Sequence, residues 1–230
     1  MKIGVLLATF EVGADAAFAS ARRADEAGLD GVFAYDHLWP MGSPTRPSLA
    51  PFAVLAAITR RHERLIVGPL VARVGLTGTS HLVEQFLTLE ALAPTRVLAA
   101  LGAGDQLSAA ENLAYDVVPR DADERRALME ETANALRAVM PVWFGGGAAA
   151  TNELARRLGV TINLWDASPE RVHETALTGP VSWAGPAPKD VPAALDALAD
   201  AGATWAVLSP QANIEQLGEW RRAQPETKFH

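Results

Sequence analysis

An aspartate and a histidine stand side by side at the end of a short apolar run. The run covers residues 31–35, and Asp36, His37 and Trp39 follow it. A carboxylate beside an imidazole can set its tautomer or raise its pKa, and either effect suits proton transfer near neutral pH. The structural alternative is that Asp36 caps the next turn while His37 packs against its neighbours. The position of the pair in the fold decides between these interpretations.

Eight short apolar segments run through the chain, and a helical pattern follows each of them. The segments cover residues 2–8, 31–36, 64–72, 96–101, 141–144, 161–165, 180–184 and 204–208. Helices are expected at about 14–27, 49–59, 80–92, 121–140, 148–158, 170–177, 191–201 and 213–222, with residues 106–120 as a longer connection. This alternation predicts an α/β fold, a (β/α)8 TIM barrel, as one domain over residues 1–230. An open doubly wound sheet is the main alternative, although it more often uses about five to seven strands.

In such barrels the chemistry lies at the C-terminal ends of the strands. Polar residues and tryptophans follow several of the predicted strand ends: Asp36, His37, Arg73, Asp105, Trp39, Trp165 and Trp183. We therefore expect them to surround one mouth, which would suit a flat ligand with polar groups. Arg73 either holds an anionic substrate group or forms a structural bridge with Asp36 or Asp105.

Two glycine-rich turns also follow predicted strands. Gly145, Gly146 and Gly147 precede a helix, where free backbone N–H groups and the helix dipole favour a phosphate; a tight turn is the structural alternative. Gly102 and Gly104 lack the third glycine of a dinucleotide fingerprint. We expect them to let a ring approach the backbone closely.

Composition limits the classes of function. The chain has 49% hydrophobic residues and a net charge of −7, which argues against nucleic-acid binding. It has no cysteine, so disulfides and thiolate chemistry are excluded. We expect no metal site, because the other histidines fall on predicted helices or at the tail. The apolar run at residues 3–8 is too short to cross a membrane, so we expect a cytoplasmic protein.

Several blocks resemble the luciferase-like monooxygenase family, and within it the branch that uses the deazaflavin coenzyme F420. The similar blocks are residues 24–30 leading into Asp36-His37-Leu38, residues 66–71, residues 88–92 followed by 96–104, Phe144-Gly145-Gly146, and residues 201–205. Their order and spacing cover nearly the whole chain. The resemblance implies a deazaflavin or flavin ring in the mouth of a barrel.

The resemblance also implies roles for single residues. Leu70 and Val71 would form a bulge behind the ring, where relatives often have a non-proline cis peptide bond. His37 would accept or donate a proton during hydride transfer, with Asp36 as its orienting partner. Asp105 stands where such dehydrogenases have a glutamate, and Gly145, Gly146 and Gly147 match the segment that holds the cofactor phosphate. Arg73 would contact the ring or the substrate, and Trp39 and Trp165 the substrate.

The expected activity is hydride transfer between coenzyme F420 and a small organic substrate. An FMN-dependent monooxygenase supplied by a separate reductase is the first alternative. A non-catalytic flavin-binding protein is the second, because family members are commonly longer and this chain has little room for their lid insertions. The resemblance further implies a homodimer formed through the helices predicted at residues 49–59 and 80–92.

Overall fold

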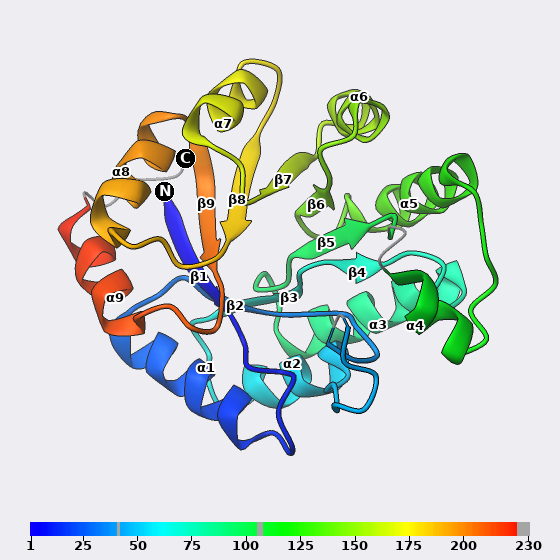
Figure 1. The fold of residues 1–230 in the computed structure, drawn as a ribbon, viewed down its shortest axis with the longest axis horizontal. Coiled ribbons are helices and arrows are strands. Elements are labelled where there is room, and N and C mark those ends of the chain that lie inside the picture. The colour runs from blue at the N-terminus through cyan, green and yellow to red at the C-terminus, as the bar shows by residue number, and fades with distance from the viewer. Residues whose placement is uncertain (41, 105–107, 225–230) are drawn as a thin grey trace.

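Strands and helices alternate along most of the computed structural model, which describes residues 1–40, 42–104 and 108–224 (Figure 1). The strands are β1 (Lys2–Leu6), β2 (Gly31–Ala34), β3 (Ile66–Pro69), β4 (Ala72–Arg73), β5 (Ala99–Gly102), β6 (Val142–Gly145), β7 (Thr161–Trp165), β8 (Val181–Gly185) and β9 (Ala203–Leu208). The helices are α1 (Asp15–Ala27), α2 (Pro51–Thr59), α3 (Thr79–Leu92), α4 (Ala109–Ala114), α5 (Ala122–Leu136), α6 (Ala149–Leu158), α7 (Pro169–Ala176), α8 (Val191–Asp200) and α9 (Ile214–Ala223).

The strands form one parallel sheet in the order β3-β2-β1-β9-β8-β7-β6-β5-β4. The sheet closes where Val67 of β3 pairs with Val97: the Val67 N–H donates to the Arg96 carbonyl at 2.8 Å, and the Leu98 N–H donates to the Val67 carbonyl at 2.9 Å. β3 and β4 are two parts of one barrel strand, separated at Leu70 and Val71. The predicted TIM barrel is therefore confirmed, with its third strand divided rather than continuous over residues 64–72.

The peptide bond between Leu70 and Val71 is cis, as the family resemblance implied. It lies at the point where β3 ends, and β4 resumes one residue later. β3 pairs with β2, whereas β4 pairs with β5. Through Val67, β3 also pairs with Val97 just before β5, and β4 continues the pairing with β5 toward the mouth.

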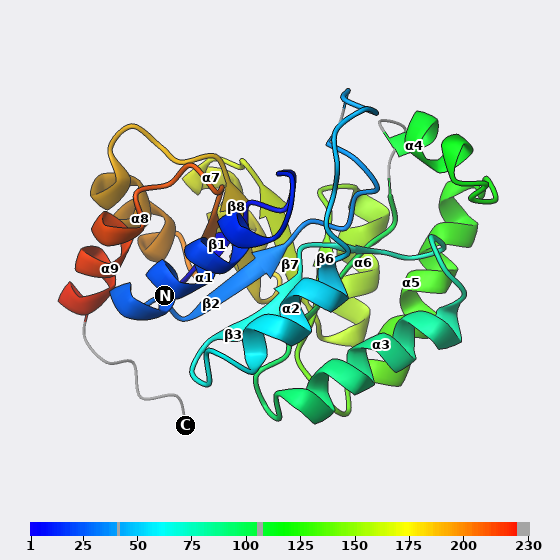
Figure 2. The same ribbon diagram turned by 90° about the horizontal axis from the view of Figure 1, so that it is seen from below.

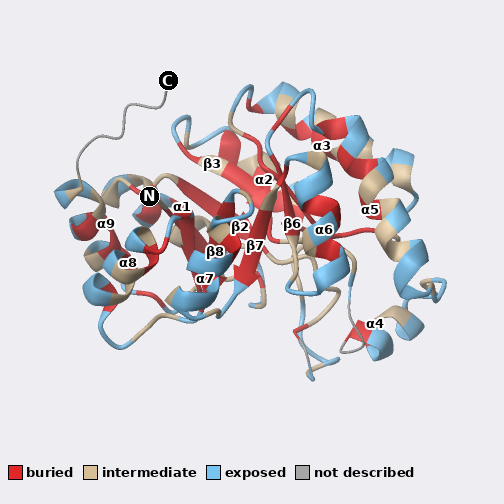
Figure 3. Cartoon of the chain, turned by 90° about the horizontal axis from the view of Figure 1, so that it is seen from above, coloured by how far each residue is buried: buried red, intermediate tan, exposed pale blue. Residues whose placement is uncertain are grey.

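Large aromatic side chains fill the barrel interior. Phe33, Trp143 and Trp205 contact one another with ring centroids 5.6–5.9 Å apart, and aliphatic residues such as Leu6 and Leu98 pack around them. A second apolar layer lies between the strands and the surrounding helices. Figure 3 shows this arrangement as buried residues concentrated in the strands and on the inward helix faces. Neighbouring residues of a strand point to opposite faces, so the nearly continuous apolar strands supply both layers.

Local signals explain most of the helix ends. α1 stops at Gly28, whose φ of 82° is left-handed and suits glycine. α5 starts at Asp121, which forms a capping box with Glu124. The expectation that residues 106–120 form only a connection was wrong, because α4 lies within them. Its six residues are too few to show a clear helical period.

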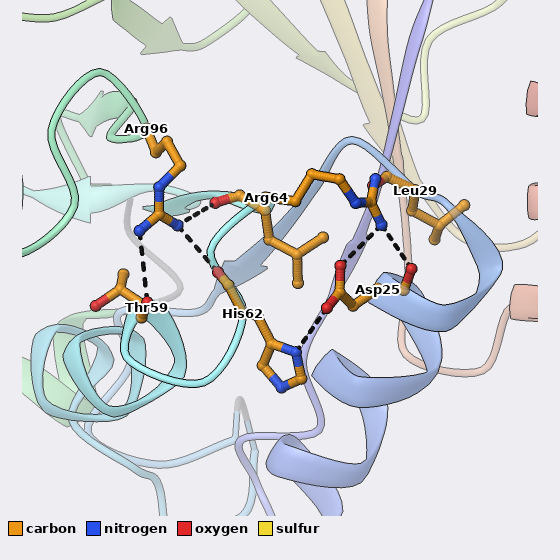
Figure 4. Close-up of polar contacts among 7 residues, drawn as sticks. Asp25, Leu29, Thr59, His62, Arg64 and Arg96 are labelled. Atoms are coloured by element: carbon orange, nitrogen blue, oxygen red, sulfur yellow. Dashed lines mark hydrogen bonds and ion pairs between the residues drawn. The ribbon is translucent and has the colours of Figure 1, made fainter.

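The N-terminal ends of the strands carry a polar network that joins α1, α2 and β3 (Figure 4). Arg64 donates to the Asp25 carboxylate at 2.8 Å and to the Asp25 carbonyl at 2.6 Å, and His62 Nδ1 lies 3.0 Å from the same carboxylate. Arg96 donates to the carbonyl groups of His62 and Leu65, both at 3.0 Å. These bonds tie together the loops at this end of the barrel.

The C-terminal ends of the strands carry the larger projections. Figure 2 shows α4 and the chain between β2 and α2 at the same end of the molecule. In the described ranges, every helix is too short or too polar to span a membrane.

Candidate active site

His37 lies just past the end of β2 and is held by a carboxylate from α4. Its Nδ1 atom is 3.0 Å from Glu111 Oε2. The Leu38 backbone N–H donates to Glu111 Oε1, so the glutamate binds both the ring and the chain that follows it. The Glu111 side chain is only 2% exposed, whereas that of His37 is 21% exposed. An imidazole with one buried partner and one accessible side is suited to proton transfer at the mouth.

Arg73 of β4 completes this cluster. Its guanidinium donates to Glu111 Oε1 at 3.0 Å and to the Asn112 side-chain oxygen at 3.1 Å. The Arg73 side chain is 7% exposed, so the ion pair is buried. Of the two roles left open for Arg73, the structure shows the structural bridge, but its acid is Glu111.

Asp36 contacts the backbone of Arg73 rather than the ring of His37. Its Oδ2 atom accepts the Arg73 backbone N–H at 2.8 Å, and its carbonyl accepts Arg73 Nε at 2.8 Å. Burial raises the pKa of the Asp36 carboxyl, an effect that the Arg73 N–H and the charges of Arg73 and His37 partly oppose. The expectation that Asp36 directly orients His37 was therefore wrong, since Glu111 makes that contact. Asp36 instead holds the end of β2 against Arg73 of β4 at the mouth.

Two aromatic residues lie next to His37. Phe10 stacks on Tyr35 with ring centroids 5.1 Å apart and an interplanar angle of 11°, and both rings are about 6.5 Å from the His37 ring. Burial raises the pKa of Tyr35 to about 12, so its hydroxyl keeps its proton at neutral pH. These rings add a flat apolar surface beside the polar cluster.

Val71 explains two of the glycines predicted to bind a cofactor. A Cβ atom at Gly102 would lie 2.3 Å from Val71 Cγ2, and one at Gly145 would lie 2.7 Å from Val71 Cγ1. Both glycines therefore make room for the Val71 side chain, which packs against the interior cluster together with Leu70. The expected close approach at Gly102 exists, but the approaching group is a valine of this chain.

The other predicted glycines lie in more open surroundings. Gly104 is exposed with a left-handed φ of 71°. Gly146 and Gly147 lead into α6, whose N-cap, Ala148, provides no side-chain hydrogen bond. A Cβ at Gly147 would meet nothing within 4 Å. The start of α6 thus keeps backbone N–H groups available for an anion.

The predicted tryptophans differ in their surroundings. Trp39 contacts Tyr115 with centroids 5.6 Å apart. Trp165 is 54% exposed at the end of β7, four strands from β2 and so across the mouth. Trp183 does not belong to the mouth, because it is buried and its indole N–H donates to the Ala167 carbonyl at 2.9 Å. Asp105 lies outside the described residues.

Glu111 and Asn112 were missed by the sequence interpretation. The available signal was the placement of an acid and an amide, within an otherwise alanine- and leucine-rich stretch, shortly after the strand that ends at Gly102. A cavity of about 490 Å³ lies beside the resulting cluster. Its lining includes Asp36, His37, Arg73, Phe52 and Tyr115. A small organic molecule fits such a volume.

Comparisons with known proteins indicate the family of this chain. The model of the luciferase-like monooxygenase family matches residues 1–141. The chain is 38% identical over 89 residues to an F420-dependent glucose-6-phosphate dehydrogenase of Intrasporangium calvum, and 32% identical over 123 residues to one of Beutenbergia cavernae. The aligned parts are 37% and 53% of this chain. They are only 26% and 35% of those relatives, so the chain spans well under half of their length.

Solved structures extend the likeness to nearly the whole fold. An F420-dependent secondary alcohol dehydrogenase, solved with an F420-acetone adduct, superposes with a TM-score of 0.79. The superposition covers 95% of this chain and 97% of that one, at 14% sequence identity. At this identity the likeness concerns the fold alone. Together with the family match over more than half of its residues, it shows that the chain belongs to the luciferase-like monooxygenase family.

Proposed function

We propose that this protein is an oxidoreductase that transfers a hydride between coenzyme F420 and a small organic substrate. The observation that carries the proposal is the partly accessible His37 at the mouth of the barrel, held at Nδ1 by the buried Glu111. Support also comes from the relatives with matching segments, which are named F420-dependent dehydrogenases. FMN is the alternative cofactor.

The mouth contains groups that fit such a cofactor. Val71 and the stacked Phe10 and Tyr35 offer apolar surfaces for a flat ring. Gly147 and the uncapped start of α6 offer N–H groups for a phosphate, whereas the Gly146 N–H donates to the Asn163 carbonyl at 3.2 Å. A bound deazaflavin supplies a carbon that accepts or releases a hydride.

His37 handles the proton in this proposal. The Glu111 carboxylate accepts the Nδ1 proton, which leaves Nε2 as the nitrogen that faces substrate. When an alcohol is oxidised, the C–H bond releases its hydride to the cofactor and the O–H proton goes to Nε2, which yields a carbonyl compound. In the reverse direction Nε2 returns the proton to the carbonyl oxygen. Arg73 is a positioning residue, because it holds Glu111.

The test is a fluorescence titration of the purified protein with F420 and, separately, with FMN. We expect F420 to bind more tightly than FMN. Hydride transfer is then followed in a spectrophotometric assay that mixes reduced F420 with a panel of small ketones and aldehydes. The readout is the rise in absorbance of the oxidised cofactor. Tight FMN binding without F420 binding would replace the proposal with a monooxygenase that depends on a reductase, a reading that the family's description favours.

Binding of F420 with no turnover of any substrate would instead support a non-catalytic cofactor-binding protein. A His37→Ala variant separates this case from an incomplete substrate panel. The variant should bind F420 as wild type does. Weaker binding of a substrate candidate to the variant would show that His37 contacts it and that the panel lacks the true substrate, whereas equal binding of every candidate would support the non-catalytic protein. Trp39 and Trp165, on opposite sides of the mouth, are proposed substrate contacts, and Trp→Ala variants should raise KM more than they lower kcat.

A homodimer through α2 and α3 is part of the proposal. A shallow cavity of about 210 Å³ lies between these helices, lined by Phe52, Ala56, Leu89 and Leu92 among others, and Leu92 is partly exposed. Sedimentation equilibrium should give twice the chain mass, and Leu92→Glu should give a monomer. A wild-type protein that stays monomeric at all concentrations would contradict this assembly. A cytoplasmic location stays a prediction.

A further inference from the structure

A second cavity, of about 270 Å³, lies beside the Arg73 cluster. It is enclosed by the loop that follows β4, by α4, and by the chain that leads from α4 into α5. Most of its lining is apolar, but Arg73, Arg120 and Arg125 also line it. Three guanidinium groups around one small space repel one another, and an anion between them would relieve this repulsion.

Only one of these arginines has a carboxylate. Arg73 is paired with Glu111. Within residues 1–40, 42–104 and 108–224, Arg120 and Arg125 form no ion pair. Arg120 Nη1 donates to the Gly75 carbonyl at 3.1 Å, and Arg125 Nη1 donates to the Arg120 carbonyl at 2.6 Å. These bonds hold the two side chains in place but leave their charges uncompensated.

Arg125 also retains an unused donor. Its Nε atom is buried and has no hydrogen-bond acceptor among the described residues. A buried unpaired donor is costly unless a further group satisfies it or relaxes toward it. The guanidinium is thus not saturated by the protein.

The acids at the start of α5 are occupied elsewhere. Asp121 and Glu124 bind each other's backbone in the capping box of α5, and Asp123 pairs with Arg126 on the surface. Neither the start of α5 nor α4, whose Glu111 faces Arg73 and His37, provides a carboxylate to Arg120 or Arg125.

We propose that this cavity binds an oxyanion group of the substrate, either a carboxylate or a phosphate. A guanidinium presents paired N–H donors that match two oxygens of either group. Arg73 lines this cavity and also the larger one that contains His37, so an anion held here is next to the proton-transfer cluster. This inference rests on the proposed function for the identity of the substrate, but the anion site itself does not depend on it.

The first test is a calorimetric titration of the full chain with inorganic phosphate, at an ionic strength kept constant with potassium chloride. We expect saturable binding of about one phosphate per chain. Heats that do not saturate, or that equal those of added chloride, would show an adventitious ion only and would overturn the proposal.

Two variants and a matched control locate the site. Arg125→Gln removes one guanidinium, and Ala109→Glu places a carboxylate in the wall of the cavity while keeping all the arginines. Either change should weaken phosphate binding at least about tenfold, the size of one lost charge-assisted hydrogen bond. Arg126→Gln changes the neighbouring arginine, which pairs with Asp123 outside the cavity, and should leave binding unchanged. If Arg125→Gln does not fold, Ala109→Glu decides; equal affinity in that variant and wild type would overturn the site.

A final experiment shows whether the bound anionic group belongs to the substrate or to the cofactor. F420 is titrated into wild-type protein and into Ala109→Glu, with and without saturating phosphate. Equal F420 affinity under all four conditions supports a substrate group. A tenfold loss in the variant, with phosphate competing in the wild type, would assign the anion to the cofactor and overturn the substrate assignment. Phosphate binding without any F420 binding would overturn the proposed F420-dependent activity but not the anion site.

Discussion

The two ends of the barrel each hold a histidine, a carboxylate and an arginine in nearly the same geometry. His37 Nδ1 lies 3.0 Å from Glu111 at the C-terminal end, and His62 Nδ1 lies 3.0 Å from Asp25 at the N-terminal end. Each carboxylate also accepts an arginine, Arg73 at 3.0 Å and Arg64 at 2.8 Å. The contact geometry of a histidine and an acid therefore does not by itself identify an active site.

The two clusters differ in burial and in what they face. Glu111 and Arg73 are 2% and 7% exposed, whereas Asp25 and Arg64 are 28% and 55% exposed. His37 borders a cavity of about 490 Å³. His62 lies among loops whose carbonyl groups are bound by Arg96 (Figure 4). In TIM barrels the C-terminal end carries chemistry and the N-terminal end stability, and the predictions below test that division from the largest expected effect to the smallest.

Removing the two histidines should separate the two ends most clearly. His37→Ala should lower turnover by about 10²–10⁴-fold, because the proton then lacks a positioned acceptor. His62→Ala should leave kcat/KM within about twofold of wild type and reduce only stability. The measurement is steady-state kinetics of both variants, together with F420 titration to show that the mouth stays formed. Equal losses of turnover in both variants would contradict the division.

Removing the two carboxylates should separate the ends by stability. Glu111→Gln leaves the buried Arg73 without its counter-charge, and we expect a loss of about 3–5 kcal/mol in the free energy of unfolding. Asp25→Asn breaks a partly exposed pair and should cost about 1 kcal/mol or less. Urea unfolding followed by tryptophan fluorescence gives both values under one set of conditions. A Glu111→Gln variant as stable as Asp25→Asn would mean that α4 is not anchored through this ion pair.

The sequence was enough to predict the barrel but not the cluster at its mouth. Strand and helix positions follow from local signals such as Gly28 and Asp121, and parallel pairing then brings Asp36, His37 and Arg73 to one end. The contact between His37 and Glu111 joins residues 74 positions apart through a six-residue helix. Neither helical periodicity nor the adjacency of Asp36 to His37 predicts that His37 contacts Glu111. Sequence neighbours thus suggested the wrong carboxylate.

The glycines around Val71 give a steric test of the mouth. Gly102→Ala places a methyl group 2.3 Å from Val71 Cγ2 if nothing moves, and we expect a loss of about 1–3 kcal/mol in stability through overpacking. Val71→Ala in the same chain removes the clash and should restore part of that loss. A double-mutant cycle of unfolding free energies measures the coupling. Independent, additive effects would mean that Val71 is not the group for which Gly102 makes room.

The smallest predicted effect concerns Asp36 and depends on pH. Burial raises the pKa of the folded-state carboxyl above its usual value of 3.8, so the folded chain holds the proton more tightly than the unfolded chain does. Ionising Asp36 therefore costs stability as the pH rises through its folded pKa. Asp36→Asn removes this cost and keeps a side-chain oxygen for the Arg73 N–H. Its stability relative to wild type should then increase from pH 4 to pH 7, as urea unfolding at each pH would show.

Asp25→Asn, which loses an ion pair at the other end, should be less stable than wild type at neutral pH. If Asp36→Asn behaves in the same way, the Asp36 carboxylate stabilises the fold through its charge, and the two ends resemble each other more closely than their burial indicates.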